Sequence, residues 1–190
     1  MQALRQQYRA QLAQVRPEDL VFVDESGVNR GMTRLYARSP RGQRARGSAP
    51  RNYGPNVSVL AALSLAGPLA SLHVEGSADG ELFRLFVTEV LVPVLWPGAV
   101  VVWDNLSIHQ AAGVREAIEA AGARLVCLPP YSPDLNPIEH AWSKFKSQLR
   151  KAAARTTKAL HAALGEALAA ISHADAQGYF RHCGYCGSAA

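Results

Sequence analysis

The sequence predicts an α/β fold, with a mixed sheet that carries helices on both of its faces. Short apolar runs such as 20–23 and 100–103 indicate buried strands. Longer segments carry apolar residues at helical spacing, and the predicted order is strands first, then alternating helices and strands, then helices. The length of 190 residues and the hydrophobic fraction of 48% suit a single domain with one core.

The individual elements follow from these patterns. Strands are predicted at 20–25, 57–65, 69–74, 99–103 and 123–128, and helices at 2–15, 79–95, 111–121, 136–151 and 157–171. The turn at 66–68, Ala-Gly-Pro, predicts an antiparallel hairpin between the second and third strands. The segment 38–55 is rich in Arg, Gly, Pro and Ser, which predicts a long loop or an irregular hairpin. The expected organisation is a connecting helix in 1–17, one domain over 18–175 and a C-terminal tail over 176–190.

Basic residues are unevenly distributed along the chain, whose net charge is +5. Seven arginines and no acid lie between Asn29 and Tyr53, and a second acid-free basic stretch covers 144–158. Such stretches are typical of a surface that contacts a phosphate backbone. The side chains expected to contact DNA are Arg38, Arg41, Arg44, Arg46, Lys144, Lys146 and Arg150.

Sequence features also bear on the compartment. No apolar stretch approaches the roughly 20 residues of a membrane span, and the first residues lack the apolar region of a signal peptide. We therefore expect no membrane partner and a cytoplasmic location. The chain has three cysteines, Cys127, Cys183 and Cys186, and in such a reducing compartment we expect no disulfide between them. A structural zinc site needs four ligands, and the CxxC pair supplies only two of them. We therefore favour a flexible tail over a zinc site for this segment.

Three carboxylates occupy positions that a buried metal site would use. Asp24 ends the apolar run 20–23, Asp104 ends the run 100–103, and Glu139 opens a predicted helix. Carboxylates that converge at the rim of a sheet repel one another unless a cation neutralises them, and oxygen ligands suit Mg²⁺ or Mn²⁺. The alternative for each Asp is a turn or helix cap, and for Glu139 it is the second half of a capping box with Asn136.

The predicted helix at 136–151 has two stripes. One is apolar and consists of Ile138, Trp142, Phe145 and Leu149; the other, along its flank, consists of Glu139, Ser143, Lys146 and Arg150. One helix would thus hold a carboxylate at its start and two cations along the same edge. That arrangement suits a metal at one phosphate, with backbone contacts running away from it.

Three strings resemble the catalytic core of DDE transposases, most closely the bacterial insertion-sequence enzymes of the mariner superfamily. They are 23–27 (VDESG), 103–109 (WDNLSIH) and 130–139 (PYSPDLNPIE). The last string, followed by Trp142 and Lys146, is highly specific. The 34 residues between Asp104 and Glu139 match the spacing of that family.

This resemblance implies a ribonuclease-H-like catalytic domain over 18–175 that cleaves DNA at transposon ends and transfers the strands into target DNA. It implies that Asp24, Asp104 and Glu139 hold two Mg²⁺ ions, for which Mn²⁺ can substitute. The implied partners are double-stranded DNA, a second copy in a homodimer on DNA, and a fused or separate N-terminal helix-turn-helix region. The implied location is the nucleoid of a bacterial cytoplasm.

The resemblance also suggests individual roles. Asp24 would bridge the two ions, Asp104 would bind one of them and Glu139 the other. Water would be the first nucleophile and the freed 3′ hydroxyl the second. Asn105 could brace Asp104. His109 could contact phosphate or orient a ligand, or it could be a capping or core histidine.

Two other functions fit the same residues. The first is a ribonuclease H or a related structure-specific nuclease, although such enzymes typically use a fourth carboxylate and do not carry the string at 130–139. The second is a non-catalytic DNA-binding remnant, which loss of a triad member would indicate; no member is lost.

Overall fold

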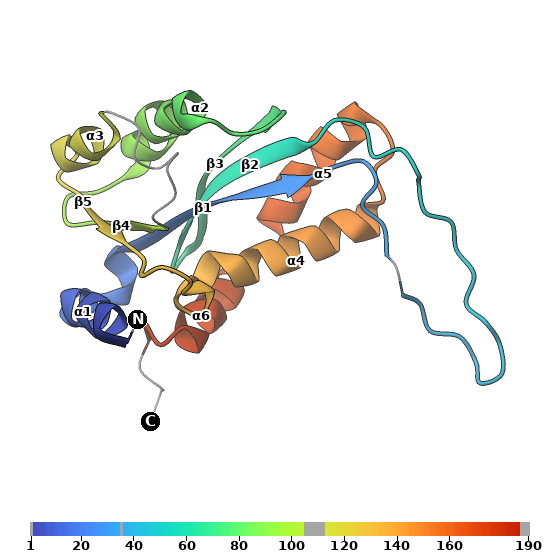
Figure 1. Ribbon diagram of the computed structural model, residues 1–190, viewed down its shortest axis with the longest axis horizontal. Helices are drawn as coiled ribbons and strands as arrows, with labels where there is room; N and C mark the ends of the chain where they lie inside the picture. The colour runs from blue at the N-terminus through green and yellow to red at the C-terminus, as the bar shows by residue number, and fades with distance from the viewer. Residues whose placement is uncertain (1, 35, 105–112, 187–190) are drawn as a thin grey trace.

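The protein is described here by a computed structural model that covers residues 2–34, 36–104 and 113–186 (Figure 1). Its sheet has five strands in the order β3-β2-β1-β4-β5. The strands are β1 (Leu20–Val28), β2 (Val57–Ser64), β3 (Gly67–Glu75), β4 (Val100–Trp103) and β5 (Arg124–Cys127). β1, β2 and β3 pair antiparallel, whereas β4 and β5 continue the sheet parallel to β1. The predicted mixed sheet and its hairpin are therefore confirmed.

Helices complete the fold. They are α1 (Gln2–Leu12), α2 (Gly80–Leu85), α3 (Val114–Ala120), α4 (Pro137–Ala152), α5 (Thr157–Ala169) and α6 (His173–His182). A π-helical segment, Phe86–Leu91, and a 3-10 turn, Val92–Val94, extend α2, so the helix predicted at 79–95 changes its winding along its length. Two more 3-10 turns, Pro17–Asp19 and Pro133–Leu135, precede β1 and α4. None of the described helices is both long and apolar enough to cross a membrane.

The alternation of side chains along β1 separates two apolar layers. Leu20 and Phe22 pack into a core that includes residues of α4, α5 and α6. Val21 and Val23 point to the other face and pack against α2, its π-helical extension and α3. Figure 1 shows these two sets of helices on opposite sides of the sheet, as the sequence predicts.

The segment between β1 and β2 forms a long loop. Residues 36–55 contain no helix or strand, and 36–49 are all exposed. In Figure 1 the loop extends away from the body of the protein. Of the two predicted alternatives for 38–55, the structure shows the loop.

The C-terminal segment differs from its prediction. Residues expected in a flexible tail from 176 onward include most of α6, whose start is fixed by a capping box between Ser172 and Asp175. Phe180 is fully buried and packs edge-on against Phe22 of β1, with ring centroids 5.3 Å apart. Cys183 is also buried. The expectation of a flexible tail is therefore wrong as far as residue 186, because a distant strand supplies the apolar surface that this short helix covers.

Candidate active site

The parallel pairing of β1 with β4 brings Asp24 and Asp104 together. The paired register ends at Phe22 opposite Val102, and each aspartate lies two residues further along its own strand direction. Side chains two residues apart point to the same face, so both carboxylates lie on the face that α4 covers. Asp24 and Asp104 are far apart in the sequence, so the parallel pairing of their strands is what brings the two carboxylates together.

The strand that carries Asp24 is longer than predicted. β1 continues to Val28 through its pairing with β2, in which Asp24 lies opposite Ala61. Asp24 is thus inside a strand rather than at its end, which corrects the expectation from the sequence. Its side chain is still accessible from the pocket, because β4 ends at Trp103.

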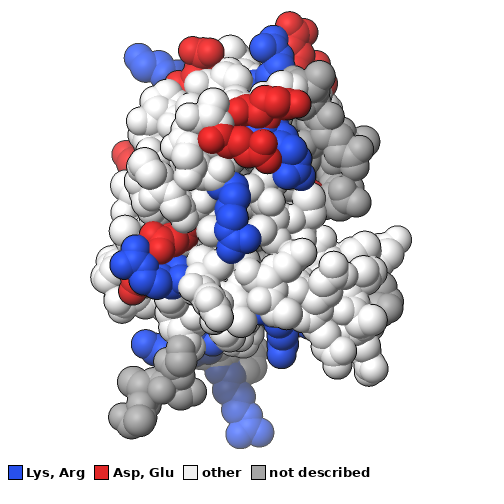
Figure 2. Space-filling model, turned by 90° about the vertical axis from the view of Figure 1, so that its left-hand side faces the viewer, with Lys and Arg blue, Asp and Glu red and all other residues white. Residues whose placement is uncertain are grey.

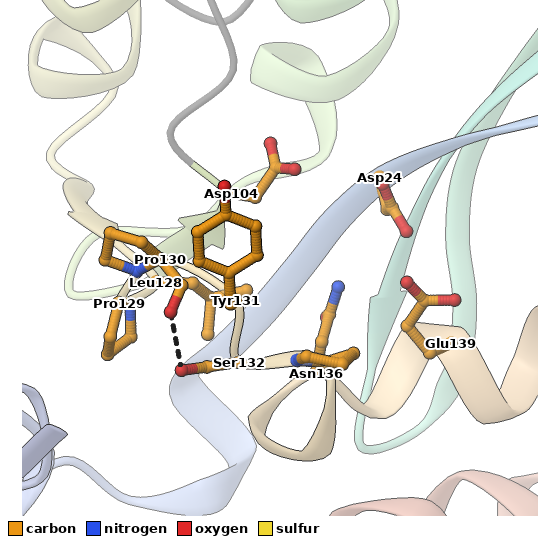
Figure 3. A pocket seen from close by; sticks show the side chains of 10 residues that line it. Asp24, Asp104, Leu128, Pro129, Pro130, Tyr131, Ser132, Asn136 and Glu139 are labelled. Carbon is orange, nitrogen blue, oxygen red and sulfur yellow. Dashed lines mark hydrogen bonds between the residues drawn. The ribbon is translucent and has the colours of Figure 1, made fainter. Parts of the chain in front are cut away.

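Glu139 reaches the same place from α4. The 3-10 turn Pro133–Leu135 leads into the helix, Pro137 occupies its start and Glu139 lies in its first turn. The three carboxylates line one pocket of about 430 Å³. The other lining residues are Leu128, Pro129, Pro130, Tyr131, Ser132, Pro133 and Asn136. Figure 3 shows Asp24 between Asp104 and Glu139, with the carboxylates of Asp24 and Glu139 directed toward each other.

Two N–H groups hold the carboxylate of Asp24. The backbone N–H of Glu25 donates to Oδ1 at 2.8 Å, and the indole N–H of Trp142 donates to Oδ2 at 3.1 Å. Burial is the largest cause that raises the pKa of Asp24, and the negative charges of Glu139 and Asp104 add to it; against the two hydrogen bonds, which lower the pKa, the net value is about 7. A carboxyl with this pKa carries a proton at neutral pH about half of the time unless a cation displaces that proton.

The capping alternative for Glu139 is not supported by the geometry. The side chain of Asn136 makes no capping hydrogen bond, and its backbone N–H donates to the carbonyl of Pro133 at 3.0 Å instead. The two reciprocal bonds of a capping box are therefore not formed. Among the described residues, the Oδ1 atom of Asn136 is buried without a hydrogen-bond partner and lies in the wall of the same pocket.

The ligand set fits a hard divalent cation. All three candidate ligands are carboxylates; burial, with the charges of Glu139 and Asp104, raises the pKa of Asp24, and a divalent cation would neutralise these charges. Within the described parts of the chain, no three His, Cys, Asp or Glu side chains are grouped closely enough to surround a single ion. The three carboxylates that line the pocket are therefore candidate ligands by their chemistry, not by a preformed three-ligand geometry.

Other predicted site residues have varied positions. Asn105 and His109 lie outside the described residues. Arg38, Arg41, Arg44 and Arg46 are exposed on the long loop. On α4, Lys146 is half-buried and Arg150 is exposed, while Lys144 donates to Asp175 of α6 at 2.5 Å. Lys144 is therefore engaged within the protein. Figure 2 views the end that carries α1 and α3, where acidic and basic side chains are interspersed and form no continuous basic patch.

Sequence reasoning missed two features of the pocket. Trp142 was assigned to the apolar stripe and to the family-like string but not to the site, yet its indole N–H donates to Asp24. Its position three residues after Glu139, one helical turn along, was the available signal. Tyr131 lies at the pocket wall with 92% of its surface exposed and a φ of 53°, which is uncommon for a residue other than glycine.

Comparison with known families places the chain in one class. The sequence profile described as "DDE superfamily endonuclease" matches residues 19–161, and this chain belongs to that family. A comparison with curated proteins finds no match.

Solved structures of the Mos1 mariner transposase share the fold. The paired-end complex with Mn superposes with a TM-score of 0.77 at 16% identity, covering 96% of this chain and 57% of that one. The pre-cleavage transpososome gives 0.73 at 17% identity, with 96% and 56% covered. The Mos1 catalytic domain alone gives 0.67 at 14% identity, with 96% and 83% covered. The predicted ribonuclease-H-like fold is thus confirmed, and the chain spans little more than half of the longer Mos1 chains.

Proposed function

We propose that this chain is the catalytic part of a DDE transposase, which uses divalent metal to cleave DNA at transposon ends and to join the strands to target DNA. The observation that carries this proposal is the environment of Asp24. This carboxyl is half-buried and lines one pocket with two others from converging elements, and its pKa is raised to about 7. The membership of the chain in the DDE superfamily endonuclease family and the similarity of its fold to Mos1 transposase support the same function.

Each carboxylate has a defined task in this proposal. Asp24, Asp104 and Glu139 would together hold the divalent metal, with Asp24 as the shared ligand, Asp104 on one side of it and Glu139 on the other. The N–H groups of Glu25 and Trp142 fix the orientation of Asp24, which leaves the remaining lone pairs of its oxygens for the ions. Divalent metal held there would supply the positive charge that neutralises the phosphate and activates the attacking and leaving oxygens.

DNA contacts are assigned to two basic surfaces. On α4, Lys146 and Arg150 follow Glu139 along the helix, so a strand whose phosphate sits at the carboxylates would continue past them. The arginines of the long loop form the second surface. Lys144 is left out of the α4 surface, because Asp175 already binds its ammonium group. A homodimer on DNA and a helix-turn-helix region for end recognition, fused or separate, complete the proposal.

The test is cleavage of duplex DNA carrying the cognate ends, in Mg²⁺ or Mn²⁺, by the wild type and by Glu139→Gln. A helix-turn-helix region is added if the chain is inert alone. The matched control is Glu116→Gln, since Glu116 is an exposed glutamate on α3, away from the pocket. We expect the first variant to lose cleavage by orders of magnitude and the control to retain it.

Other outcomes would point elsewhere. Preferential cleavage of an RNA–DNA hybrid over duplex DNA would favour a ribonuclease H. DNA binding without cleavage of either substrate would favour a non-catalytic remnant. Equal cleavage by the wild type and Glu139→Gln would remove Glu139 from the metal site.

A further inference from the structure

The turn that delivers Glu139 is tied to α1, an element from the opposite end of the sequence. Nη1 of Arg5 donates to Oδ1 of Asp134 and to Oγ of Ser132, both at 3.0 Å. Nη2 of Arg5 donates to the second oxygen of Asp134. Ser132 is 4% exposed and lines the carboxylate pocket. One guanidinium thus holds both ends of the short turn 132–134.

A second tie from α1 reaches the next residue of the same turn. The hydroxyl of Tyr185 donates to the backbone carbonyl of Leu135 at 2.6 Å. Tyr8 of α1 lies 2.6 Å from that hydroxyl, and since the proton of Tyr185 is used on Leu135, Tyr8 is the donor. The ring of Tyr185 also packs on Phe22 of β1, with centroids 4.9 Å apart, so this chain of bonds is anchored in the core.

The turn needs such support from outside because it has little of its own. It follows the end of β5 without joining the sheet, and its internal backbone bonds are Leu135 N–H to Ser132 and Asn136 N–H to Pro133, both at 3.0 Å. It also borders Tyr131, whose backbone has a positive φ. Glu139 comes four residues after Leu135, so any displacement of the turn moves the first turn of α4 and its carboxylate.

A surface ion pair alone would contribute little, and Asp134 is 60% exposed. Three features distinguish the contact of Arg5. Its fork is bidentate, its third bond goes to a buried hydroxyl in the pocket wall, and its partners lie directly ahead of a proposed metal ligand. These features favour a role in the geometry of the pocket over a role in global stability.

We propose that Arg5, supported by Tyr8 and Tyr185, is a positioning residue that fixes the 132–136 turn and thereby the place of Glu139. The consequence for metal binding rests on the proposed function. The effect of Arg5 on the position of the turn does not depend on the proposed function.

The experiment compares Arg5→Gln with Arg16→Gln as a matched control. Arg16 forms a similar forked pair with Asp19, at 2.8 and 3.1 Å, outside the pocket. Three quantities are measured on the full chain: melting without metal, hydrogen exchange of the amides in 133–139, and Mn²⁺ affinity by calorimetry. In Arg5→Gln we expect exchange to be faster by about tenfold and Mn²⁺ binding to weaken by about tenfold, the effect of losing one or two hydrogen bonds. Melting should change little, and the control should match the wild type.

Exchange at wild-type rates in Arg5→Gln, or equal acceleration in the control, would overturn the proposal. Faster exchange with unchanged Mn²⁺ affinity would remove the link to Glu139. The double variant Arg5→Asp with Asp134→Arg should recover part of both effects, since the pair is restored and the bond to Ser132 is not. Should the wild type bind no Mn²⁺, the proposed function fails, and the exchange comparison still decides whether α1 holds the turn.

Discussion

Replacing Asp24 by Asn should change the pH dependence of stability in a direction that the structure fixes. Burial and two neighbouring carboxylates raise the pKa of Asp24 to about 7, from 3.8 as the ordinary value. A carboxyl whose pKa is higher in the folded state stabilises the fold at low pH, and that contribution is lost as the pH rises through 7. The metal-free wild type should therefore lose stability between about pH 4 and 7 through this group.

The size of the effect follows from the shift. At about 1.4 kcal/mol per pKa unit, a shift of about three units corresponds to about 4 kcal/mol, taken as an upper bound. The amide introduced by Asp24→Asn cannot ionise, but it has a single acceptor oxygen where Glu25 and Trp142 present two donors. Leaving one donor unsatisfied costs about 1–3 kcal/mol. The variant should thus be less stable than the wild type at pH 4 and equally or more stable at pH 8.

Urea unfolding with a metal chelator at several pH values measures this difference. Subtracting the two curves cancels the titration of the shared groups that do not interact with Asp24, and leaves that of Asp24 with its coupling to Glu139 and Asp104. The difference should rise in favour of the variant between pH 5 and 8. Parallel curves over this range would show that Asp24 titrates normally, and the argument from burial and repulsion would then be wrong.

Three further predictions test neighbouring parts of the structure. Trp142→Phe removes a hydrogen bond that favours the ionised form of Asp24, so calorimetry at pH 7 should show Mn²⁺ binding weakened by about three- to tenfold; equal affinity would mean that the indole N–H has no part in the site. Changing Lys146 and Arg150 together to Ala should flatten the plot of log DNA affinity against log salt by about 1.8, near 0.9 for each phosphate that is no longer neutralised; an unchanged slope would place the DNA elsewhere. Phe180→Ala should lower the free energy of unfolding by about 3–5 kcal/mol, measured in urea, because the side chain is fully buried; a decrease below about 1 kcal/mol would mean that α6 is not part of the core.

The strands of the sheet and the candidate roles of Asp24 and Asp104 were predicted from the same sequence pattern. Apolar runs at 20–23 and 100–103 mark buried strands, and the aspartates that directly follow these runs line one pocket, although β1 itself continues past Asp24. The stripe of α4 was predicted equally well, and Ile138, Trp142 and Phe145 are all buried. These features depend on local patterns, which a sequence displays directly.

Features that depend on distant partners were missed. β1 extends to Val28 although Glu25, Ser26 and Gly27 interrupt its apolar run, because β2 supplies a complete set of backbone partners. The helix α6 has few apolar residues, and Phe22 of β1 supplies the surface that it covers. The ties from α1 to the 132–136 turn likewise join residues more than 120 positions apart.

A titration of Mn²⁺ into the metal-free protein at pH 7 tests most directly whether the three carboxylates form one metal site. The proteins compared are the wild type, Asp24→Asn, Asp104→Asn, Glu139→Gln and the control Glu116→Gln, each in buffers of different ionisation enthalpy. The wild type and the control should bind Mn²⁺ and release about half a proton from Asp24, whose pKa is near 7. Asp24→Asn should lose this proton release, and all three site variants should lose most of the affinity. Wild-type affinity in any one of the three would contradict a shared site, and binding without proton release would contradict a role for Asp24 in it.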